Sequence, residues 1–487
     1  MTKSTPMNAT TRDQGPLTWG RRTGYAAGDL GSNLYWQSIS LFLYFFYTDT
    51  LGISPLWAGI AFAIGSIFDA VSDPVMGSIA DRTRSKRGRY RPYILWGAAP
   101  LGLSFAAMFY VPPLSGIALV IYATLSHVLC RAFYTVVNIP YLAMSVNLSS
   151  DSGERANIAG LRMVFAALGA ITVAFFLPKA IAALTGSVAQ PWLIVALLLG
   201  LIATLVLIIC YASTRENAFS DDAQDSPLTM QSIVGEITRD VKKFWGMLLN
   251  NGPLARVFGA IVVISVALTM FSKNIIYWFK YALLRPDLVP VALVIPALML
   301  FLCAPLWVWF AKRSSKRTAW MLSSLFAALG YVGFYANQSA HIPTSLGLIV
   351  LIGMGTSGFA IMYWAMLPDT VEYNEWKLGE RNEAKVVGFA ALAQKTALAI
   401  NALILGQVLN WVGYTANTAL SADTLAGIKA TMCLVPLLGV FISAGLLWKY
   451  PISPAFHRRI LGELIERDKK RPPPTPEDPY YKNISTK

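Results

Sequence analysis

Asp69 and Asp73 stand four residues apart inside the apolar stretch 56–79. Residues at this spacing lie on one face of an α-helix, about 5–6 Å apart at Cβ. Two carboxylates in a medium of low dielectric constant cannot both stay ionised without partners. Either one takes a proton, or a hard cation such as Na⁺ or Li⁺ lies between them, or both pair with basic residues of neighbouring helices. Because permanent pairing would leave nothing to titrate, we favour a cation-binding site.

Other ionisable residues also fall inside apolar stretches, where each costs several kcal/mol unless it is paired or hydrated. They are Asp29, Arg131, Arg162, Lys273 and Lys395. Lys395 is far from the ends of its stretch, and we expect it to balance the charge of the aspartate pair. Two interpretations of Arg162 have equal weight. In one its guanidinium reaches the cytoplasm; in the other it binds paired hydroxyls or a carboxylate.

Uncharged polar and aromatic side chains accompany these charges and are candidates for substrate contacts. They are Asn33, Gln37, Tyr134, Asn138 and Trp364. Aromatic rings beside hydrogen-bonding groups suit the C–H faces of a sugar, although most Trp and Tyr residues of such a chain are expected at membrane interfaces. The apolar stretches contain no nucleophile–base pair, metal-ligand cluster or phosphate-binding loop. We therefore expect a protein that is not an enzyme and that uses no cofactor.

The composition places these residues in a membrane. Hydrophobic residues make up 55% of the 487 residues and charged residues 14%, against about 25% charged in soluble domains. The apolar residues form blocks about 20 residues long, which match the hydrocarbon core of a bilayer. The net charge of +14 comes from Lys and Arg between the blocks, a positive-inside pattern that indicates orientation rather than nucleic-acid binding. The polar N-terminus resembles no cleaved signal peptide.

Twelve apolar segments predict an all-α membrane protein of twelve transmembrane helices in two six-helix bundles. The first and third segments are Tyr25–Phe46 and Tyr93–Tyr110. Six segments, a long polar connection and six more segments are typical of a parallel repeat in secondary transporters. Both termini are expected in the cytoplasm, and the localisation expected is the cell inner membrane. The predicted parts are an N-terminal segment 1–23, a first bundle 24–211, a middle loop 212–253, a second bundle 254–450 and a tail 451–487 that is disordered or lies on the anionic leaflet.

The loop after the second segment carries Gly77, Asp81 and Arg82, followed by further arginines. Residues 311–317 form a degenerate echo after the eighth segment. The first loop resembles the loop signature of the major facilitator superfamily, in which the acid and arginines clasp neighbouring helix ends. A positive-inside anchor would explain the arginines but not the glycine or the aspartate, so we favour a gating role.

Several longer runs carry a more specific resemblance. They are Gly28–Asn33, Phe46–Asp49, Trp57–Gly77, Arg87–Tyr93, Tyr134–Tyr141 and Leu367–Glu383. From Gly24 to about Pro454 the chain resembles the glycoside–pentoside–hexuronide:cation symporters of the major facilitator superfamily, which include melibiose permease. The last run also contains Asp369 and Arg381, which we assign to gating.

The resemblance implies roles for individual residues. Asp69 and Asp73 match the two cation-binding aspartates of that family, and Thr135 matches the threonine that joins them. Tyr134, Arg162 and Lys395 match further residues of its binding site. Asn33 and Asn138 stand where melibiose permease has aspartates, and Leu142 replaces a tryptophan. A site that has lost two acids fits a hexuronide, a neutral pentoside or an oligosaccharide better than melibiose.

The function expected is import of a sugar or glycoside by alternating access, coupled to H⁺ or Na⁺, by a chain that is monomeric. Its partners are the sugar, a monovalent cation and the lipid bilayer, and no metal is expected beyond Na⁺ at Asp69 and Asp73. One alternative is a lysolipid transporter of the same fold, which the polar set Asn33, Gln37 and Asn138 argues against. Another is a sugar sensor that does not transport, which would not need an intact aspartate pair.

Overall fold

The computed structural model describes residues 18–148, 152–215, 230–338, 341–380 and 382–470. Within these ranges the regular structure is helical, with one isolated bridge between Thr185 and Val188. The chain divides into two compact units, Met1–Ile233 and Val234–Lys487, here called the N-terminal and C-terminal units. The division falls inside the segment 212–253 that was predicted to connect two bundles.

The N-terminal unit contains six long helices and two short π-helices, all in chain order. They are α1 (Trp19–Ser38), η1 (Ile39–Leu43), η2 (Phe46–Thr50), α2 (Pro55–Asp81), α3 (Arg91–Met108), α4 (Gly116–Asn147), α5 (Ser152–Leu184) and α6 (Pro191–Ser213). Helix α7 (Met230–Asn250) follows and carries the boundary between the units.

The C-terminal unit repeats the series and adds a terminal helix. Its elements are α8 (Gly252–Tyr277), η3 (Trp278–Ala282), η4 (Pro286–Leu288), α9 (Val289–Arg313), α10 (Lys316–Ala336), α11 (Ile342–Leu378), α12 (Glu383–Trp411), α13 (Ala422–Trp448) and α14 (Pro454–Lys470). In both units the first long helix runs into a π-helical segment before the second begins.

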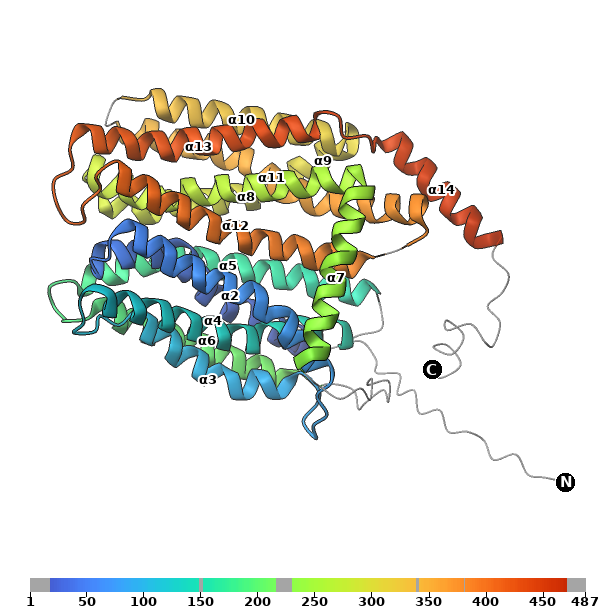
Figure 1. Cartoon of the computed structure of the whole chain (residues 1–487), viewed down its shortest axis with the longest axis horizontal. Coiled ribbons are helices and arrows are strands. Elements are labelled where there is room, and N and C mark those ends of the chain that lie inside the picture. The colour runs from blue at the N-terminus through green and yellow to red at the C-terminus, as the bar shows by residue number, and fades with distance from the viewer. Residues whose placement is uncertain (1–17, 149–151, 216–229, 339–340, 381, 471–487) are drawn as a thin grey trace. The chain divides into compact units, whose positions relative to one another are not determined.

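The six long helices of one unit pack on one another in the same pattern as those of the other unit. Figure 1 shows some of these neighbours as adjacent ribbons, such as α10 and α13. In the N-terminal unit α1 packs on α5 and α6, α2 on α4, and α3 on α4 and α6. In the C-terminal unit α8 packs on α12 and α13, α9 on α11, and α10 on α11 and α13. Each long helix of the N-terminal unit therefore has the same neighbours as its counterpart in the C-terminal unit, which is the arrangement expected of a parallel repeat.

Ten helices of the described chain are long and apolar enough to cross a membrane. The outward face of α6 supports a position in a membrane, because its side chains Leu198, Leu201 and Leu205 are each more than half exposed. An exposed apolar face of that size suits lipid better than water. Helices α1 and α3, which lie on the predicted first and third spans, are not among the ten.

Two helices were not predicted as regular structure. Helix α7, which is 21 residues long, occupies half of the expected middle loop 212–253, where the sequence is amphipathic. Helix α14 occupies the first part of the tail, so the prediction that the tail is disordered is wrong for Pro454–Lys470. Helix α14 packs on α11, and a helix held by a neighbour needs little intrinsic stability of its own. Residues 471–487 of that tail lie outside the described residues.

Close helix crossings depend on small residues, as is usual in membrane bundles. A Cβ on Gly355 of α11 would meet the backbone nitrogen of Ala327 at 2.4 Å and the carbonyl of Ser323 at 2.7 Å, both on α10. Backbone atoms cannot rotate away, so a side chain here must push the two helices apart.

We predict that Gly355→Ala lowers stability by roughly 1–3 kcal/mol, the usual cost of overpacking. Thermal unfolding of the purified protein in detergent measures this. Gly347→Ala on the same helix is the matched control, because a Cβ there meets nothing within 4 Å. Equal melting temperatures for the two variants would contradict the packing argument.

Candidate functional site

The predicted cation ligands come together in the N-terminal unit. The Thr135 hydroxyl of α4 lies 3.2 Å from Asp69 Oδ1 and 2.9 Å from Asp73 Oδ1, both on α2. The Ser72 hydroxyl is 3.1 Å from that of Thr135. Because a hydroxyl has one proton to donate, Thr135 can satisfy only one of the two carboxylates at a time. The cluster thus brings together several oxygen atoms from two helices, the donor set that protons and hard cations favour.

Pro74 affects the backbone of α2 beside this cluster. Proline has no N–H, so it cannot donate the usual hydrogen bond to the carbonyl of Ala70 four residues earlier. Helix interruptions of this kind occur in transporters where backbone carbonyls help to coordinate ions. The aspartate pair is therefore set in a stretch of helix whose backbone is locally less satisfied.

Arg131 pairs with one member of the aspartate pair. Its Nη1 lies 3.4 Å from Asp69 Oδ2, and both side chains are 1% exposed. Its Nε donates to His127 Nε2 at 3.1 Å, and its guanidinium lies over the Trp36 ring at 4.9 Å. The basic partner of Asp69 in this unit is thus an arginine of α4, one helical turn from Thr135.

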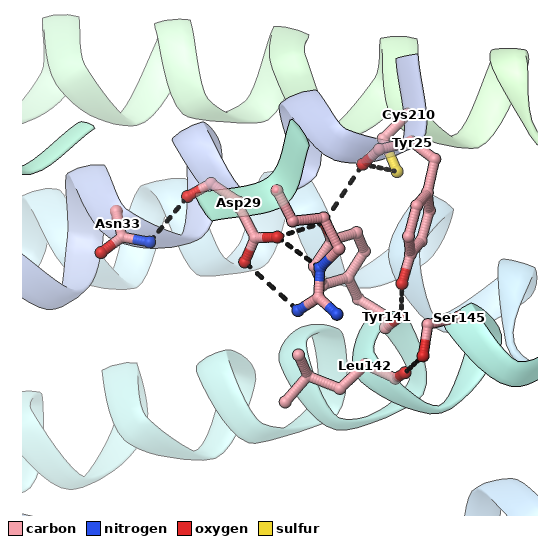
Figure 2. A network of polar contacts seen from close by, with 8 residues as sticks. Tyr25, Asp29, Asn33, Tyr141, Leu142, Ser145 and Cys210 are labelled. Atoms are coloured by element: carbon pink, nitrogen blue, oxygen red, sulfur yellow. Dashed lines mark hydrogen bonds and ion pairs between the residues drawn. The ribbon is translucent and has the colours of Figure 1, made fainter. Parts of the chain in front are cut away.

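A second network joins Asp29 of α1 to Arg162 of α5 and Tyr141 of α4. Figure 2 shows how Asp29, Tyr141 and Tyr25 lie in it. Arg162 Nε is 2.5 Å from Asp29 Oδ2, and the Tyr141 hydroxyl is 2.9 Å from the same oxygen. Tyr25 donates to the carbonyl of Tyr141 at 2.9 Å. Its ring and that of Tyr141 lie 5.9 and 5.4 Å from the guanidinium, in the range of cation–π attraction. Of the two readings for Arg162, the one in which it binds a carboxylate fits this geometry, and the carboxylate belongs to the protein.

Gly28 makes room for this network. A Cβ at that position would lie 2.5 Å from the Tyr141 ring. The glycine next to Asp29 is therefore required for α1 and α4 to approach closely enough for the aspartate to reach the tyrosine.

The charges of the two networks nearly cancel. Three carboxylates, Asp29, Asp69 and Asp73, face two guanidiniums, Arg131 and Arg162, so the five formal charges sum to −1. Addition of one proton or one monovalent cation brings this set to neutrality.

The uncharged candidates of the N-terminal unit lie on the same helices. Asn33 donates to the carbonyl of Asp29 at 2.9 Å, and the Gln37 amide is 3.5 Å from Asn33 Oδ1. Tyr134 is buried with its ring 6.0 Å from that of Trp36. Asn138 is half-buried one turn further along α4. The polar residues predicted to contact substrate thus continue directly from the ion cluster along α1 and α4.

Three candidates belong to the C-terminal unit. Lys273 of α8 is 1% exposed, Lys395 of α12 is half-buried, and Trp364 of α11 is 44% exposed. The Trp364 ring lies 5.0 Å from that of Tyr363, whose hydroxyl accepts a hydrogen bond from Gln394, the neighbour of Lys395. The predicted charge balance between Lys395 and the aspartate pair joins the two units and stays a prediction.

Three of the predicted gating residues lie at or near the end of α2. Asp81 ends α2 and accepts a hydrogen bond from the Tyr90 hydroxyl at 2.7 Å. Burial and this contact raise the pKa of Tyr90 to about 12, so the phenol keeps its proton at physiological pH. Arg82 caps the same helix end. A Cβ on Gly77 would meet only Ile139, at 3.9 Å, so the packing in this structure does not require glycine there.

Of the predicted gating residues in the C-terminal unit, the structure describes Asp369 of α11. Lys316 Nζ lies 2.7 and 2.8 Å from its two oxygens, and His457 of α14 lies 3.6 Å away and contacts Glu372. The lysine comes from the degenerate loop echo 311–317. Arg381 lies outside the described residues.

The sequence reasoning missed several of these partners. It identified Asp29 and Arg162 as intramembrane charges but did not join them, and it omitted Tyr25, Tyr141, His127 and His457. The available signal was the requirement that a buried charge have an opposite partner. The pairing needs knowledge of which helices are neighbours, and hydropathy does not supply it.

Known proteins resemble this chain over most of its length. The profile of a family described as "MFS/sugar transport protein" matches residues 24–454. The chain is 30% identical to the uncharacterized symporter YnaJ of Bacillus subtilis, over 92% of this chain and 95% of that protein. It is also 30% identical to the isoprimeverose transporter of Lactiplantibacillus pentosus, over 93% of this chain and 92% of that one.

The fold has solved counterparts. The nucleoside transporter NupG superposes with a TM-score of 0.63, covering 89% of this chain and 100% of that chain. The two sequences are 12% identical, so the likeness is one of fold.

We predict that Asp29→Asn destabilises the protein by about 3–5 kcal/mol, because it leaves the guanidinium of Arg162 largely buried without its counter-charge. The double variant Asp29→Leu/Arg162→Met removes both charges and should be more stable than the single variant. Thermal unfolding in detergent measures both effects.

The control for this pair is Asp287→Asn, which breaks the exposed ion pair with Arg285. Exposed pairs contribute little to stability because solvent screens them, so its melting temperature should stay close to that of the wild type. A double variant no more stable than Asp29→Asn would argue against an internal ion pair.

Proposed function

The chain belongs to the MFS/sugar transport protein family, the family of glycoside–pentoside–hexuronide:cation symporters, and we propose that it imports a sugar or glycoside together with H⁺ or Na⁺. It is thus a multi-pass membrane transporter rather than an enzyme. Our proposal includes twelve spans, with α1 and α3 added to the ten that meet the apolar criterion, both termini in the cytoplasm, and a monomer in a bacterial inner membrane.

The observation that carries the proposal is the hydroxyl of Thr135 shared by Asp69 and Asp73. Arg131 pairs with Asp69, but the two carboxylates still repel each other across one hydroxyl donor, and a proton or a cation shared by them would relieve that repulsion. Binding of that cation neutralises the local charge. A neutral cluster costs less free energy among apolar helices while the transporter changes between its two states. Thus coupling follows from the cost of carrying an uncompensated charge.

Substrate binding is assigned to the polar residues beside the ion cluster. They are Asn33, Gln37, Tyr134, Asn138, Arg162, Lys273, Trp364 and Lys395. In the N-terminal unit, Asn33 is one turn from Asp29 and Tyr134 adjoins Thr135. A sugar that orders α1 and α4 therefore acts on the helices that hold the cation ligands, and by linkage each ligand raises the affinity for the other equally.

The energetic yield of coupling is sufficient for nutrient uptake. One charge moving through ~100 mV releases roughly 2.3 kcal/mol, which corresponds to about fifty-fold accumulation. In alternating access, the contacts at Gly77, Asp81 and Arg82 in one unit and at Asp369 and Arg381 in the other would open and close. The Asp81–Tyr90 contact lies at the end of α2, and the Asp369–Lys316 contact joins α11 to the first residue of α10, so such a change would require these partners to exchange.

We predict that Asp69→Asn and Asp73→Asn each abolish uphill accumulation while part of the exchange activity remains. Either change removes one of the two charges that a cation must neutralise, so transport loses its driving force but not its pathway. Uptake of labelled sugar into membrane vesicles, with the Na⁺ and pH gradients varied independently, measures accumulation, and counterflow measures exchange.

Asp423→Asn, an exposed acid in the first turn of α13, is the matched control and should transport normally. Full ion-driven accumulation by both aspartate variants would refute the proposed ion site. The same gradients also decide between protons and Na⁺, because only the coupling ion drives the wild type.

We further predict that Asn33→Asp and Asn138→Asp shift selectivity away from acidic sugars. A like charge within about 8 Å costs on the order of 2 kcal/mol at an effective dielectric constant of about 20, or roughly 30-fold. The ratio of hexuronide uptake to neutral-glycoside uptake should therefore fall by about that factor.

A panel of neutral pentosides, oligosaccharides and hexuronides gives this ratio. The control is Asn410→Asp, on an exposed residue near the end of α12. It should leave the ratio of hexuronide uptake to neutral-glycoside uptake unchanged if the charge acts only locally. An unaltered ratio in both site variants would remove the two asparagines from the sugar site.

A further inference from the structure

A cavity of about 410 Å³ opens at the end of the C-terminal unit where lysine and arginine are concentrated. It is bounded by the end of α9, the start of α10, the middle of α11 and the chain that enters α14. Apart from Asp369, which we assign to gating, none of its lining residues is a candidate for the sugar or the coupling cation. Its volume lies within the range typical of small-molecule sites.

The acidic groups at the inner wall already have basic partners. Lys316 Nζ contacts both oxygens of Asp369 and the carbonyl of Ala365 at 2.8 Å. His457 contacts Glu372 and lies 3.6 Å from Asp369. Lys316 therefore compensates one of the two negative charges, and Glu372 has a hydrogen-bonded partner in His457.

The mouth of the cavity keeps its positive charge. Lys312 and Arg458 line it, both are exposed, and neither forms an ion pair with a residue that the structure describes. One comes from the loop echo after α9 and the other from the first turn of α14. Two cations on separate elements, facing one opening, form a site for a multivalent oxyanion.

The remaining wall is apolar. Val308 of α9, Ile361 and Met362 of α11, and Ile452 before α14 supply it. An inorganic anion would gain nothing from contact with this apolar wall. A phosphate ester with a hydrocarbon portion would contact the two cations with its phosphate and the apolar wall with its hydrocarbon. Basic pockets at the cytoplasmic ends of membrane helices are a recognised setting for anionic lipid headgroups.

The cavity is held in shape by the docking of α14. Trp376 of α11 donates to Glu463 at 2.6 Å, and Arg467 donates to the carbonyl of Trp376 at 2.7 Å. The Phe456 ring packs 5.8 Å from that of Trp376. The hydrogen bond from Trp376 and the ion pair with Arg459 lower the pKa of Glu463. Its carboxylate is therefore ionised at physiological pH and accepts the hydrogen bond from Trp376. A docked helix gives a preformed site, which reduces the ordering cost of binding.

We propose that this cavity binds an amphiphilic phosphate ester, with its phosphate at Lys312 and Arg458 and its hydrocarbon portion against Ile361 and Met362. Such a ligand joins α9 to α14 and adds to the contacts around Asp369. It therefore favours the state of the transporter in which the Lys316–Asp369 pair is closed, a regulatory effect beyond transport itself. The ligand comes either from an anionic phospholipid or from a soluble organic phosphate.

The test uses the full chain purified in detergent. Dioctanoyl phosphatidylglycerol is the probe, dioctanoyl phosphatidylcholine its zwitterionic counterpart, and glycerol 3-phosphate the soluble ester. Native mass spectrometry and thermal shift measure binding. We expect saturable binding of phosphatidylglycerol that weakens at least tenfold in the double variant Lys312→Glu/Arg458→Glu.

Two further variants separate the site from general charge and from misfolding. Arg313→Glu/Lys449→Glu makes the same change in net charge with exposed residues that do not line the cavity, and it should bind as the wild type does. Ile361→Trp fills the cavity while every cation remains, and it should lose binding. Size-exclusion profiles verify that each variant is folded.

The outcomes are distinct. Competition by glycerol 3-phosphate identifies a soluble ester as the natural class, and binding of phosphatidylglycerol alone identifies a lipid. Equal binding of the two dioctanoyl lipids, or undiminished binding by the Lys312→Glu/Arg458→Glu variant, would overturn the proposal. Neither result bears on Asp69 and Asp73, so the proposed symport stands or falls separately.

Discussion

The cost of placing a charge among apolar helices governs the rest of this structure. The N-terminal unit meets it with two ion pairs, Asp29–Arg162 between α1 and α5 and Asp69–Arg131 between α2 and α4. Each pair joins helices that already pack together, so charge compensation and helix packing support one another. Two carboxylates on one helix face repel each other, and a proton or a cation between them would lower that cost. In the proposed function, this cost couples the ion to the change of state of the transporter.

The proposed ion site and the proposed substrate contacts lie close together along shared helices. Thr135 is one turn from Arg131 on α4, and Tyr134 is its neighbour in the chain. Asn33 is bonded to the backbone of Asp29 on α1. The proposed sugar contacts and the charged networks therefore share two helices, and a ligand that fixes one end of such a helix restrains the other. Rigid helices with shared neighbours are sufficient for thermodynamic linkage between two ligands.

The two units use one packing scheme for different chemistry. Equivalent helices have equivalent neighbours, yet acids predominate inside the N-terminal unit, whereas the C-terminal unit contributes Lys273 and Lys395. Their helix ends differ as well. Asp81 is held by a tyrosine, and Asp369 by a lysine and a histidine that bring α14 into the network. Repeated backbones with divergent side chains are expected when function resides in sites rather than in the fold.

From the sequence alone the membrane class and the two-part layout follow, and Asp69 and Asp73 are predicted to share one helix face, because hydropathy and a helical spacing of four are local properties. The resemblance to a known family supplied Thr135 as the joining residue. The partners of the buried charges depended on the tertiary structure, since Arg162 meets Asp29 only because α5 packs on α1. The same holds for His457, whose contact with Glu372 requires α14 to fold and dock on α11. Helix adjacency arises from contacts distant in sequence, and local periodicity carries no information about them.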